Sequence, residues 1–405
     1  MVFIYSCGTE STPTYTLTTT VTGEGSITPS GGEYEEGETI TLTSTPSQHW
    51  LFNNWSGDGS GSSSTVTITM DRDKNIVGNF VEREYSINYT INGSGDVEEE
   101  VIQSKGEYTV GTVVQLTPVP SDGWRFTEWG GDVSGDENPL QLTITGEKNV
   151  SVKFSPIIFL GENGITIMCP DGKVGDIGIV DGVEYEVVDR NLLIQRRDDG
   201  SDLSKVCVSL VTDMGNLFRN RTFNQSIENW DVSNVTNMSW MFQDSKFNKP
   251  IDIWDVSSVS DMSWMFDRTI FNQPIGNWDV SNVTDMSIMF HISSFNQPIG
   301  DWDVSSVTDM FQMFHNSPFN QTIGEWNVSN VINMKQMFHN TPFNQPIGGW
   351  DVENVNNMSQ MFQSSSFNQP INNWCVTMIT EEPLEFSSGS PLTQQNKPIW
   401  GTCPD

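Results

Sequence analysis

Hydrophobic residues recur with a strict 24-residue period along the second half of the chain, from Met214 to Trp374, without an insertion. The columns that keep this step are Trp230, Trp254, Trp278, Trp302, Trp326, Trp350 and Trp374; Phe223, Phe247, Phe271, Phe295, Phe319, Phe343 and Phe367; and Met214, Met238, Met262, Met286, Met310, Met334 and Met358. The unit reads F-N-Q-P-I-G-x-W-D-V-S-N-V-T-D-M-S-x-M-F. A fixed period of this length predicts a solenoid in which each coil stacks only on its neighbours.

Two spacings within a coil predict two elements. Trp302 and Val304 alternate as in a short strand. Apolar residues at 307, 310, 313 and 314 then follow the i, i+3, i+6, i+7 spacing of a short helix over 307–314. About eight apolar side chains per coil should point inward under these periodicities. The cross-section is therefore leucine-rich-repeat-like, filled by Met, Phe and Trp instead of Leu.

Residues 14–155 carry a second, longer repeat. Three aromatic positions recur at one constant displacement, as the pairs Trp50 and Trp124, Trp55 and Trp129, and Phe80 and Phe154. Period-two alternation, as in 39–42 and 113–116, is separated by Gly- and Pro-containing turns. This pattern predicts two small β-rich modules of about 70 residues each. We interpret the tryptophans as core residues, with an aromatic sugar-binding platform as the alternative.

Five cysteines are present, and four of them flank the 24-residue repeats. Sequence proximity favours the pairs Cys169–Cys207 and Cys375–Cys403. A zinc site is the less favoured alternative, because no CxxC occurs and no histidine lies near either pair. Two disulfides would imply an oxidising, extracytoplasmic compartment.

The remaining cysteine, Cys7, follows the apolar run 3–6. This segment resembles a bacterial lipoprotein cleavage box, although six residues are too few for the charged and apolar regions of a signal peptide. The resemblance implies lipidation at Cys7 and attachment to the outer leaflet of a membrane. An unmodified thiol is the alternative.

The predicted fold is mostly β with short helices: two small β-rich modules, then a leucine-rich-repeat-like solenoid of seven 24-residue coils with disulfide-bonded caps. The capping segments should seal the ends of the solenoid core. We divide the chain into an anchor and linker (1–13), the first module (14–82), the second module (83–155), the N-terminal cap (156–206), the solenoid (207–374) and the C-terminal cap (375–405).

Two family resemblances follow from these motifs. Both modules resemble divergent internalin-B-type bacterial repeat domains, through the opening G-x-G-x-I-x-P at 23–29, the tryptophan pair and a terminal N-F. This implies a stalk or spacer. Residues 163–400 resemble the BspA-like leucine-rich-repeat surface proteins, in the branch that reads FNQPIGNWDVSNVTDM. That resemblance implies a bacterial cell-surface protein linked to adhesion and interaction.

Because the coils stack, polar residues 24 positions apart should lie one above the other, and we call such a column a ladder. The asparagine ladder comprises Asn224, Asn248, Asn272, Asn296, Asn320, Asn344 and Asn368. We expect it to bond the backbone of the next coil. The aspartate ladder comprises Asp231, Asp255, Asp279, Asp303, Asn327 and Asp351. We expect these oxygens to cap backbone N–H groups, with calcium as the alternative because closely spaced like charges need a partner.

Three histidines, His291, His315 and His339, lie in register on successive coils. We expect a solvated polar column at the surface without a metal. A transition-metal site or a pH sensor is the alternative, with these histidines as the candidate ligands.

Variable positions among otherwise constant repeats are the candidate contacts for a partner. We interpret Trp240, Trp264, Ile288 and Phe311 as a continuous apolar column on consecutive coils. If the column is exposed, such a patch marks a partner site. The alternative is that it packs under a loop.

Composition and the absence of catalytic motifs reduce the number of possible functions further. The chain has 19 Lys and Arg against 52 Asp and Glu, a formal net charge of −33, which excludes nucleic-acid binding through phosphates. No GxSxG, HExxH, P-loop or dinucleotide fingerprint occurs, so we expect no enzyme and no cofactor. We predict a lipid-anchored cell-surface adhesin that binds extracellular protein or polysaccharide. The alternatives are a structural spacer and a glycan-capturing lipoprotein of an uptake system.

Overall fold

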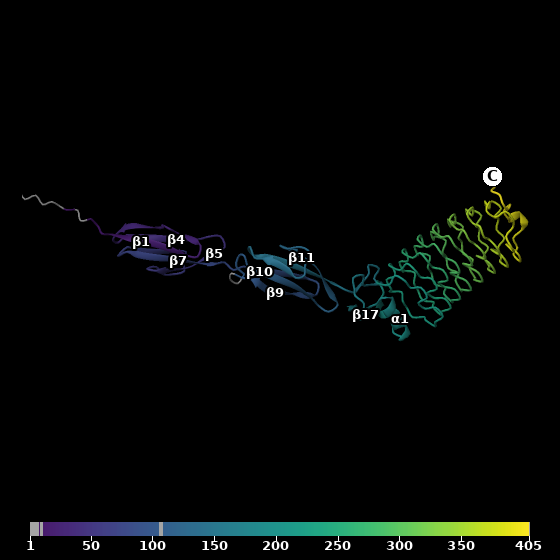
Figure 1. Cartoon of the computed structure of the whole chain (residues 1–405), viewed down its shortest axis with the longest axis horizontal. Coiled ribbons are helices and arrows are strands. Elements are labelled where there is room, and N and C mark those ends of the chain that lie inside the picture. The colour runs from purple at the N-terminus through teal and green to yellow at the C-terminus, as the bar shows by residue number, and fades with distance from the viewer. Residues whose placement is uncertain (1–7, 9–10, 105–107, 405) are drawn as a thin grey trace, which may run out of the picture. The chain divides into compact units, whose positions relative to one another are not determined.

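The computed structural model describes residues 8, 11–104 and 108–404. Cys7, the predicted lipidation site, lies outside these residues. Internal contacts divide the chain into two compact units, Met1–Ser155 and Pro156–Asp405, whose elements are labelled in Figure 1. We describe each unit by itself.

The first module of the N-terminal unit consists of two sheets. Their strands are β1 (Thr14–Thr22), β2 (Gly25–Thr28), β3 (Gly31–Glu35), β4 (Thr39–Pro46), β5 (Trp50–Gly57), β6 (Thr65–Thr69) and β7 (Lys74–Glu82). One sheet has the order β3-β1-β7-β5, with β1 parallel to β7, and the other has the order β2-β4-β6. The period-two pattern places Leu17, Ile40, Leu42 and Ile68 in the core between them.

The second module also consists of two sheets, each with three strands. Its strands are β8 (Ile87–Asn92), β9 (Gly95–Gln103), β10 (Val113–Pro120), β11 (Trp124–Gly131), β12 (Leu140–Thr143) and β13 (Lys148–Pro156). They form the sheets β11-β13-β8 and β12-β10-β9, and β8 runs parallel to β13 as β1 does to β7. The two β-rich modules predicted from the alternation are thus confirmed.

The tryptophan pairs in the modules differ in burial. Trp55 and Trp129 are each 2% exposed. Their indole N–H groups donate to the backbone oxygens of Ser63 at 2.9 Å and Glu137 at 2.8 Å. The core interpretation is therefore confirmed for this pair, because a buried indole requires such an acceptor. The other pair, Trp50 and Trp124, is half-buried.

The C-terminal unit begins with a small mixed cap. Its elements are β14 (Phe159–Leu160), β15 (Ile167–Met168), β16 (Ile177–Val180), β17 (Val183–Val187), α1 (Arg190–Asp198), the 3-10 turn η1 (Leu203–Lys205) and β18 (Val206–Cys207). Asp189 caps α1 by accepting from the Leu192 N–H at 2.8 Å. A second 3-10 turn, η2 (Gln394–Asn396), lies near the other end of the unit.

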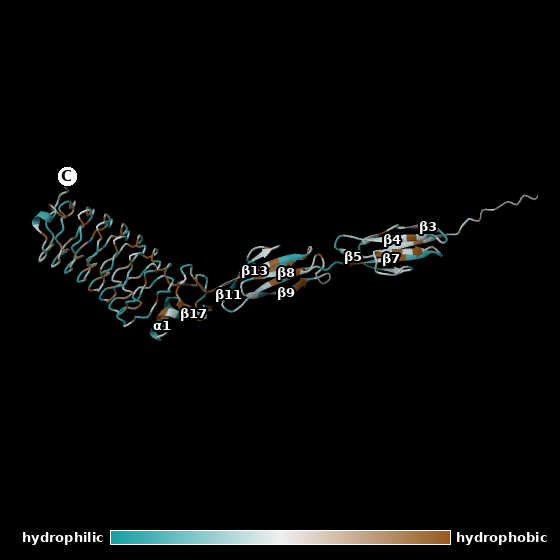
Figure 2. Ribbon diagram, turned by 180° about the vertical axis from the view of Figure 1, so that it is seen from behind, coloured by the Kyte–Doolittle hydropathy of each residue, from teal (hydrophilic) through white to brown (hydrophobic). Residues whose placement is uncertain are grey.

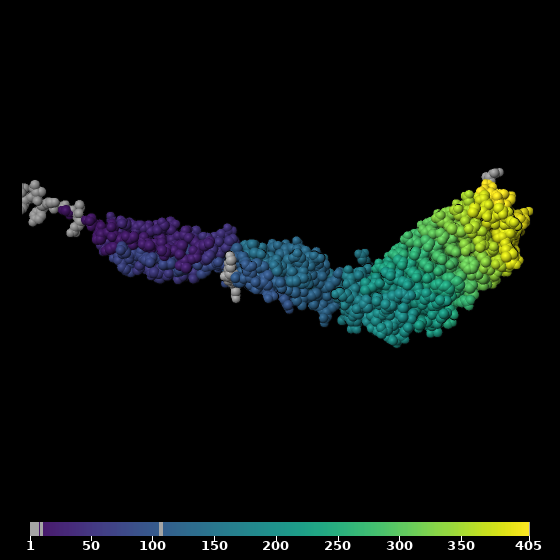
Figure 3. Space-filling model, in the orientation of Figure 1, coloured from purple at the N-terminus to yellow at the C-terminus, as the bar shows by residue number. Residues whose placement is uncertain are grey.

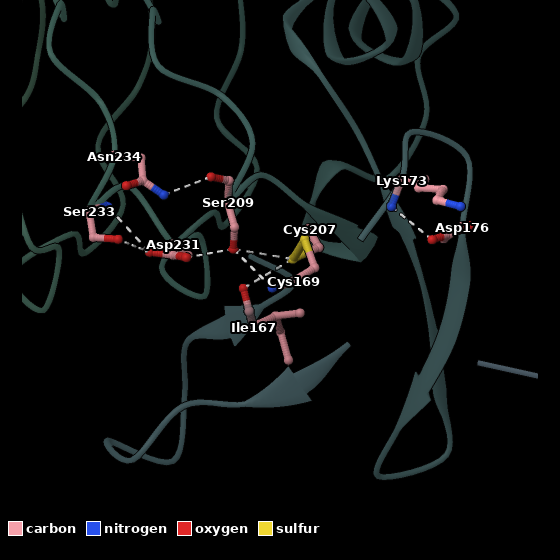
Figure 4. The surroundings of a disulfide bond; sticks show 9 residues. All are labelled: Ile167, Cys169, Lys173, Asp176, Cys207, Ser209, Asp231, Ser233 and Asn234. Carbon is pink, nitrogen blue, oxygen red and sulfur yellow. Dashed lines mark hydrogen bonds between the residues drawn. A yellow bond between two sulfur atoms is a disulfide. The ribbon is translucent and has the colours of Figure 1, made fainter. Parts of the chain in front are cut away.

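Both predicted disulfides are confirmed. Cys169 and Cys207 are bonded and fully buried in the N-terminal cap (Figure 4), and Cys375 is bonded to Cys403 at the other end. Beside the first bridge, the Ser209 hydroxyl accepts from the Cys169 N–H at 3.0 Å and donates to the Asp231 carboxylate. The first bridge is thereby tied to the first aspartate of the ladder.

The coils themselves contain neither of the two predicted elements. Residues 208–393, all of them described, form turns joined by isolated parallel bridges. The bridges connect Asp213, Asn237, Asp261, Asp285, Asp309, Asn333 and Asn357 in order. The predicted strand at Trp302–Val304 and the predicted helix over 307–314 are therefore wrong.

Backbone geometry explains the missing helix. Ile288 and Ile292 adopt left-handed φ angles of 60° and 50°. The Ile288 N–H donates to the Phe311 carbonyl of the next coil at 2.7 Å, and the Phe290 N–H donates to the Met313 carbonyl at 2.9 Å. A helix would direct these groups to carbonyls four residues back. Three-residue apolar spacing fits successive β-turns as well as a helix, and inter-coil hydrogen bonding selects the turns.

Eight apolar side chains fill each coil, as predicted. In one coil they are Phe271, Ile275, Trp278, Val280, Val283, Met286, Met289 and Phe290, each at most 3% exposed. Figure 2 shows the apolar positions repeating from coil to coil, and Figure 3 shows the outer surface of the solenoid that encloses them. Aromatic rings continue the stacking, because Phe290 lies 5.7 Å from Phe266 and 5.8 Å from Phe314 between ring centroids.

We expect Phe290→Ala to lower the free energy of unfolding of the solenoid by about 3–5 kcal/mol, because it opens a cavity between two stacked rings. Phe311→Ala, on a half-buried ring, should cost about 1 kcal/mol or less. Guanidinium denaturation followed by circular dichroism measures both. Equal losses would contradict the assignment of the stacked rings as the core.

Candidate functional site: the polar columns of the solenoid

The asparagine ladder links successive coils. The Asn296 Oδ1 accepts from the Asn320 backbone N–H at 3.0 Å and from the Gln321 Nε2 at 3.0 Å. The same backbone bond recurs from Asn224 to Asn368 at 2.9–3.0 Å. The scaffolding interpretation is confirmed, since each amide satisfies donors of the following coil.

The aspartate ladder caps turns within its own coil. The Asp279 Oδ1 accepts from the Ser281 N–H at 3.1 Å and the Ser281 hydroxyl at 2.6 Å. These serine hydrogen bonds hold the pKa of the Asp279 carboxyl below its ordinary value. Asn327 makes the equivalent bonds to Ser329, so an amide oxygen suffices. Backbone capping is thus confirmed, and calcium binding stays a prediction.

A second column of Asp and Asn residues was not singled out from the sequence. It is the column that forms the parallel bridges, and its oxygens accept from the N–H two residues later, as Asp285 does from Ser287 at 2.8 Å and Asp309 from Phe311 at 2.7 Å. Burial raises the pKa of the Asp309 carboxyl. The recurrence of Asp or Asn directly before the repeated Met was the signal that could have revealed it.

The histidine column continues a buried polar chain. The Arg219 Nε donates to the Gln243 Oε1 at 2.6 Å, and the Gln243 Nε2 donates to the Asp267 Oδ2 at 2.7 Å. The other Asp267 oxygen lies 2.7 Å from the His291 Nδ1. Asp267 is fully buried, and Gln243 and His291 are 8% and 9% exposed. The prediction of a solvated surface column is wrong at these positions, because each side chain lies against its neighbour in the adjacent coil.

His315 and His339 extend this column with half-buried rings. Ring centroids are 4.9 Å apart between His291 and His315, and 4.4 Å apart between His315 and His339. Burial lowers the pKa of His315 to about 4, and the neighbouring His339 and His291 add to this effect. Burial also lowers the pKa of His339, against the opposing influence of Gln363 and Glu385.

The predicted apolar column is shorter than expected. Trp240 and Trp264 stack at 4.0 Å between ring centroids, and both are half-buried. Arg219, from the preceding coil, lies 4.2 Å from the ring centroid of Trp240. Ile288 is 3% exposed. The flanking coils therefore cover both faces of the Trp240 ring and leave its edge toward solvent.

Phe311 does not belong to this column. The 24-residue period aligns it with Ser239, Ser263 and Ser287, and places Gln312 in register with Trp240. Its ring instead lies 5.9 Å from the Lys335 ammonium group. The structure thus brings Trp240, Trp264 and Ile288 together in one column and separates Phe311 from them. Binding by any of the four residues stays a prediction.

The solenoid should lose stability as the pH falls below about 6.5 in metal-free buffer. His315 titrates near 6.5 when unfolded but has a pKa of about 4 when folded, so the unfolded chain binds the extra proton first. We expect the melting temperature to fall by roughly 2–4 °C between pH 7 and pH 5 from this residue.

The control for this prediction is His315→Gln. Gln occupies the same column at Gln243 and Gln363, so the fold accommodates it. The variant should show a flatter pH profile by differential scanning calorimetry with chelator present. Identical profiles would contradict the prediction.

Comparisons with known proteins find a family match for each half of the chain. Residues 15–84 and 85–158 match the divergent InlB B-repeat domain, which confirms the resemblance of the two modules. No curated protein and no solved structure matches the chain. Among the described residues, no helix has the length and apolar character needed to cross a membrane.

The repeat segments match a second family model. Residues 191–294 and 289–400 match the family described as "Mycoplasma protein of unknown function, DUF285". With the InlB-type modules, this identifies a bacterial surface repeat protein. Because the matches run from 191 to 400, more than half of the 405 residues, the chain belongs to the DUF285 family.

Proposed function

We propose that this protein is a non-enzymatic adhesin or interaction protein of the bacterial cell surface, related to the BspA-like leucine-rich-repeat proteins. In this proposal a lipid at Cys7 anchors the chain, and the two InlB-type modules act as a spacer. The solenoid then binds an extracellular protein. The two family matches support its surface-repeat character.

The observation that carries this proposal is a pair of tryptophans that the fold does not require. Trp240 and Trp264 have left-handed φ angles of 62° and 60°. The same conformation is adopted in register by Gln312, Gln336 and Gln360, at 53°, 56° and 59°. Because glutamine serves the backbone equally well, packing alone does not explain half-buried tryptophans here. Tryptophan is enriched among residues that dominate binding energy at interfaces.

The geometry of the pair favours a protein partner over a sugar. Stacking on a sugar needs a free aromatic face, and Trp240 has Arg219 on one face and Trp264 on the other. A protein side chain can pack against the remaining ring edges. The net charge of −33 favours a partner with a basic surface, through long-range attraction.

A structural spacer is the second candidate. It is supported by the asparagine and aspartate ladders, whose polar groups are used within the solenoid. Under this alternative the solenoid would associate with copies of itself instead of a foreign ligand.

The test is binding of the labelled full chain to arrays of extracellular-matrix proteins and polysaccharides, and to intact cells, with and without calcium. We expect saturable binding to a protein. The double variant Trp240→Gln/Trp264→Gln, matched to the later coils, should weaken it at least about tenfold, as loss of an interface anchor does.

The matched control is Ile332→Thr, which removes an exposed apolar side chain from a different column whose preceding member is Thr308. It should leave binding unchanged. Unaltered binding by the tryptophan double variant would overturn the contact assignment. Absence of binding to every surface, with self-association at micromolar concentration, would favour the spacer.

A further inference from the structure

The histidine column contains ligand atoms that the fold leaves unused. In the described part of the chain, the Nδ1 atoms of His315 and His339 are buried and have no hydrogen-bond partner. Side chains of the same column in other coils, Gln243, Asp267 and His291, are all hydrogen-bonded. Buried polar atoms are normally satisfied, so two unpaired nitrogens on adjacent coils require an explanation, and a bound ion is one.

The neighbouring coil orients a third imidazole. The carboxylate of Asp267 is fully buried and accepts from the Gln243 Nε2, so it can accept a second hydrogen bond from the His291 Nδ1 at 2.7 Å. A proton held on Nδ1 leaves the His291 Nε2 with a free lone pair. A carboxylate hydrogen-bonded to one nitrogen of a histidine is the usual outer-shell partner of a metal-bound imidazole.

Ring spacing also fits coordination. A metal bonded to imidazole nitrogen at about 2.1 Å lies about 3.2 Å from the ring centre, which puts the centres of two rings on one ion roughly 4.5–5.2 Å apart. The observed centroid separations are 4.9 Å between His291 and His315, within this range, and 4.4 Å between His315 and His339, just below it. The three imidazoles do not converge on one point as they stand, so binding requires rotation of the rings. The rings of His315 and His339 are half-buried, and their exposed part is the side from which an ion would enter as the rings rotate.

We propose that His291, His315 and His339 together bind one divalent transition-metal ion. Imidazole nitrogen favours zinc, copper and nickel, whereas calcium and magnesium favour oxygen ligands. Burial keeps His315 neutral at pH 7, with a pKa of about 4, so its lone pair is free for a metal. This site is independent of the partner proposed for Trp240 and Trp264.

The experiment is calorimetric titration of the untagged full chain with Zn²⁺ at pH 7.5. We expect about one equivalent of zinc to bind at the site. His315→Gln and His339→Gln, which place a residue already present in the column, should each weaken binding at least about tenfold, and Asp267→Asn should weaken it 10–100-fold. Circular dichroism checks that each variant is folded.

The matched control is His49→Gln, which alters the one histidine outside the column. His49 lies in the first module, where its Nδ1 is 2.6 Å from the Tyr85 hydroxyl. This variant should bind zinc as the unmodified chain does. Loss of binding on His49→Gln, or absence of zinc binding by the unmodified chain, would overturn the proposal.

Electron paramagnetic resonance distinguishes this site from adventitious binding to so acidic a chain. One equivalent of Cu²⁺ should show hyperfine coupling to imidazole nitrogen. The double variant His315→Gln/His339→Gln should lose this coupling or show fewer coupled nitrogens. An unchanged spectrum in the double variant would overturn the assignment to these residues.

Discussion

Hydrogen bonds from each coil to the next are the constraint on which the rest of the solenoid depends. The N–H groups of Ile288, Phe290 and Ile292 all donate to carbonyls of the following coil. Such bonds recur along the solenoid, so one inserted residue would break the register between the coil that carries it and the adjacent coil. This requirement explains why the 24-residue period contains no insertion.

Strict register has a consequence for polar side chains, because each one lies against the side chain at the same position of the adjacent coil. A column of aspartates would place like charges on adjacent coils. The chain meets this constraint by directing the carboxylates to the residue two positions later, as Asp279 does to Ser281 and Asp351 to the Glu353 N–H, and by using an amide at Asn327. In the histidine column, Asp267 is placed between Gln243 and His291, which both bond it. In the described part of this column, the buried Nδ1 atoms of His315 and His339 have no hydrogen-bond partner, and for this reason the column carries the metal proposal.

The same register bears on the partner proposal. Arg219 and Trp264 stack on the faces of the Trp240 ring, so only the ring edge is available to a partner. Residues that stack in this way stabilise the solenoid, yet glutamine holds the same backbone conformation three coils later. The early and late coils therefore share one backbone conformation at this position and differ in the side chain, tryptophan or glutamine, that they present. Solenoids commonly bind partners on such extended surfaces.

The sequence alone determined the period, the eight inward positions per coil, the two β-rich modules and the two disulfide pairs. Each of these follows from the spacing of residue types along the chain, which can be counted without a structure. The tertiary structure decided what spacing leaves open. Apolar residues three apart fit a helix or consecutive turns, and the direction of the Ile288 N–H toward the next coil settled it. A residue beside a core phenylalanine can face solvent or lie against the adjacent coil, and the full burial of Asp267 became visible only when the coils were stacked. Contacts between equivalent positions of adjacent coils depend on side-chain direction, which periodicity does not encode.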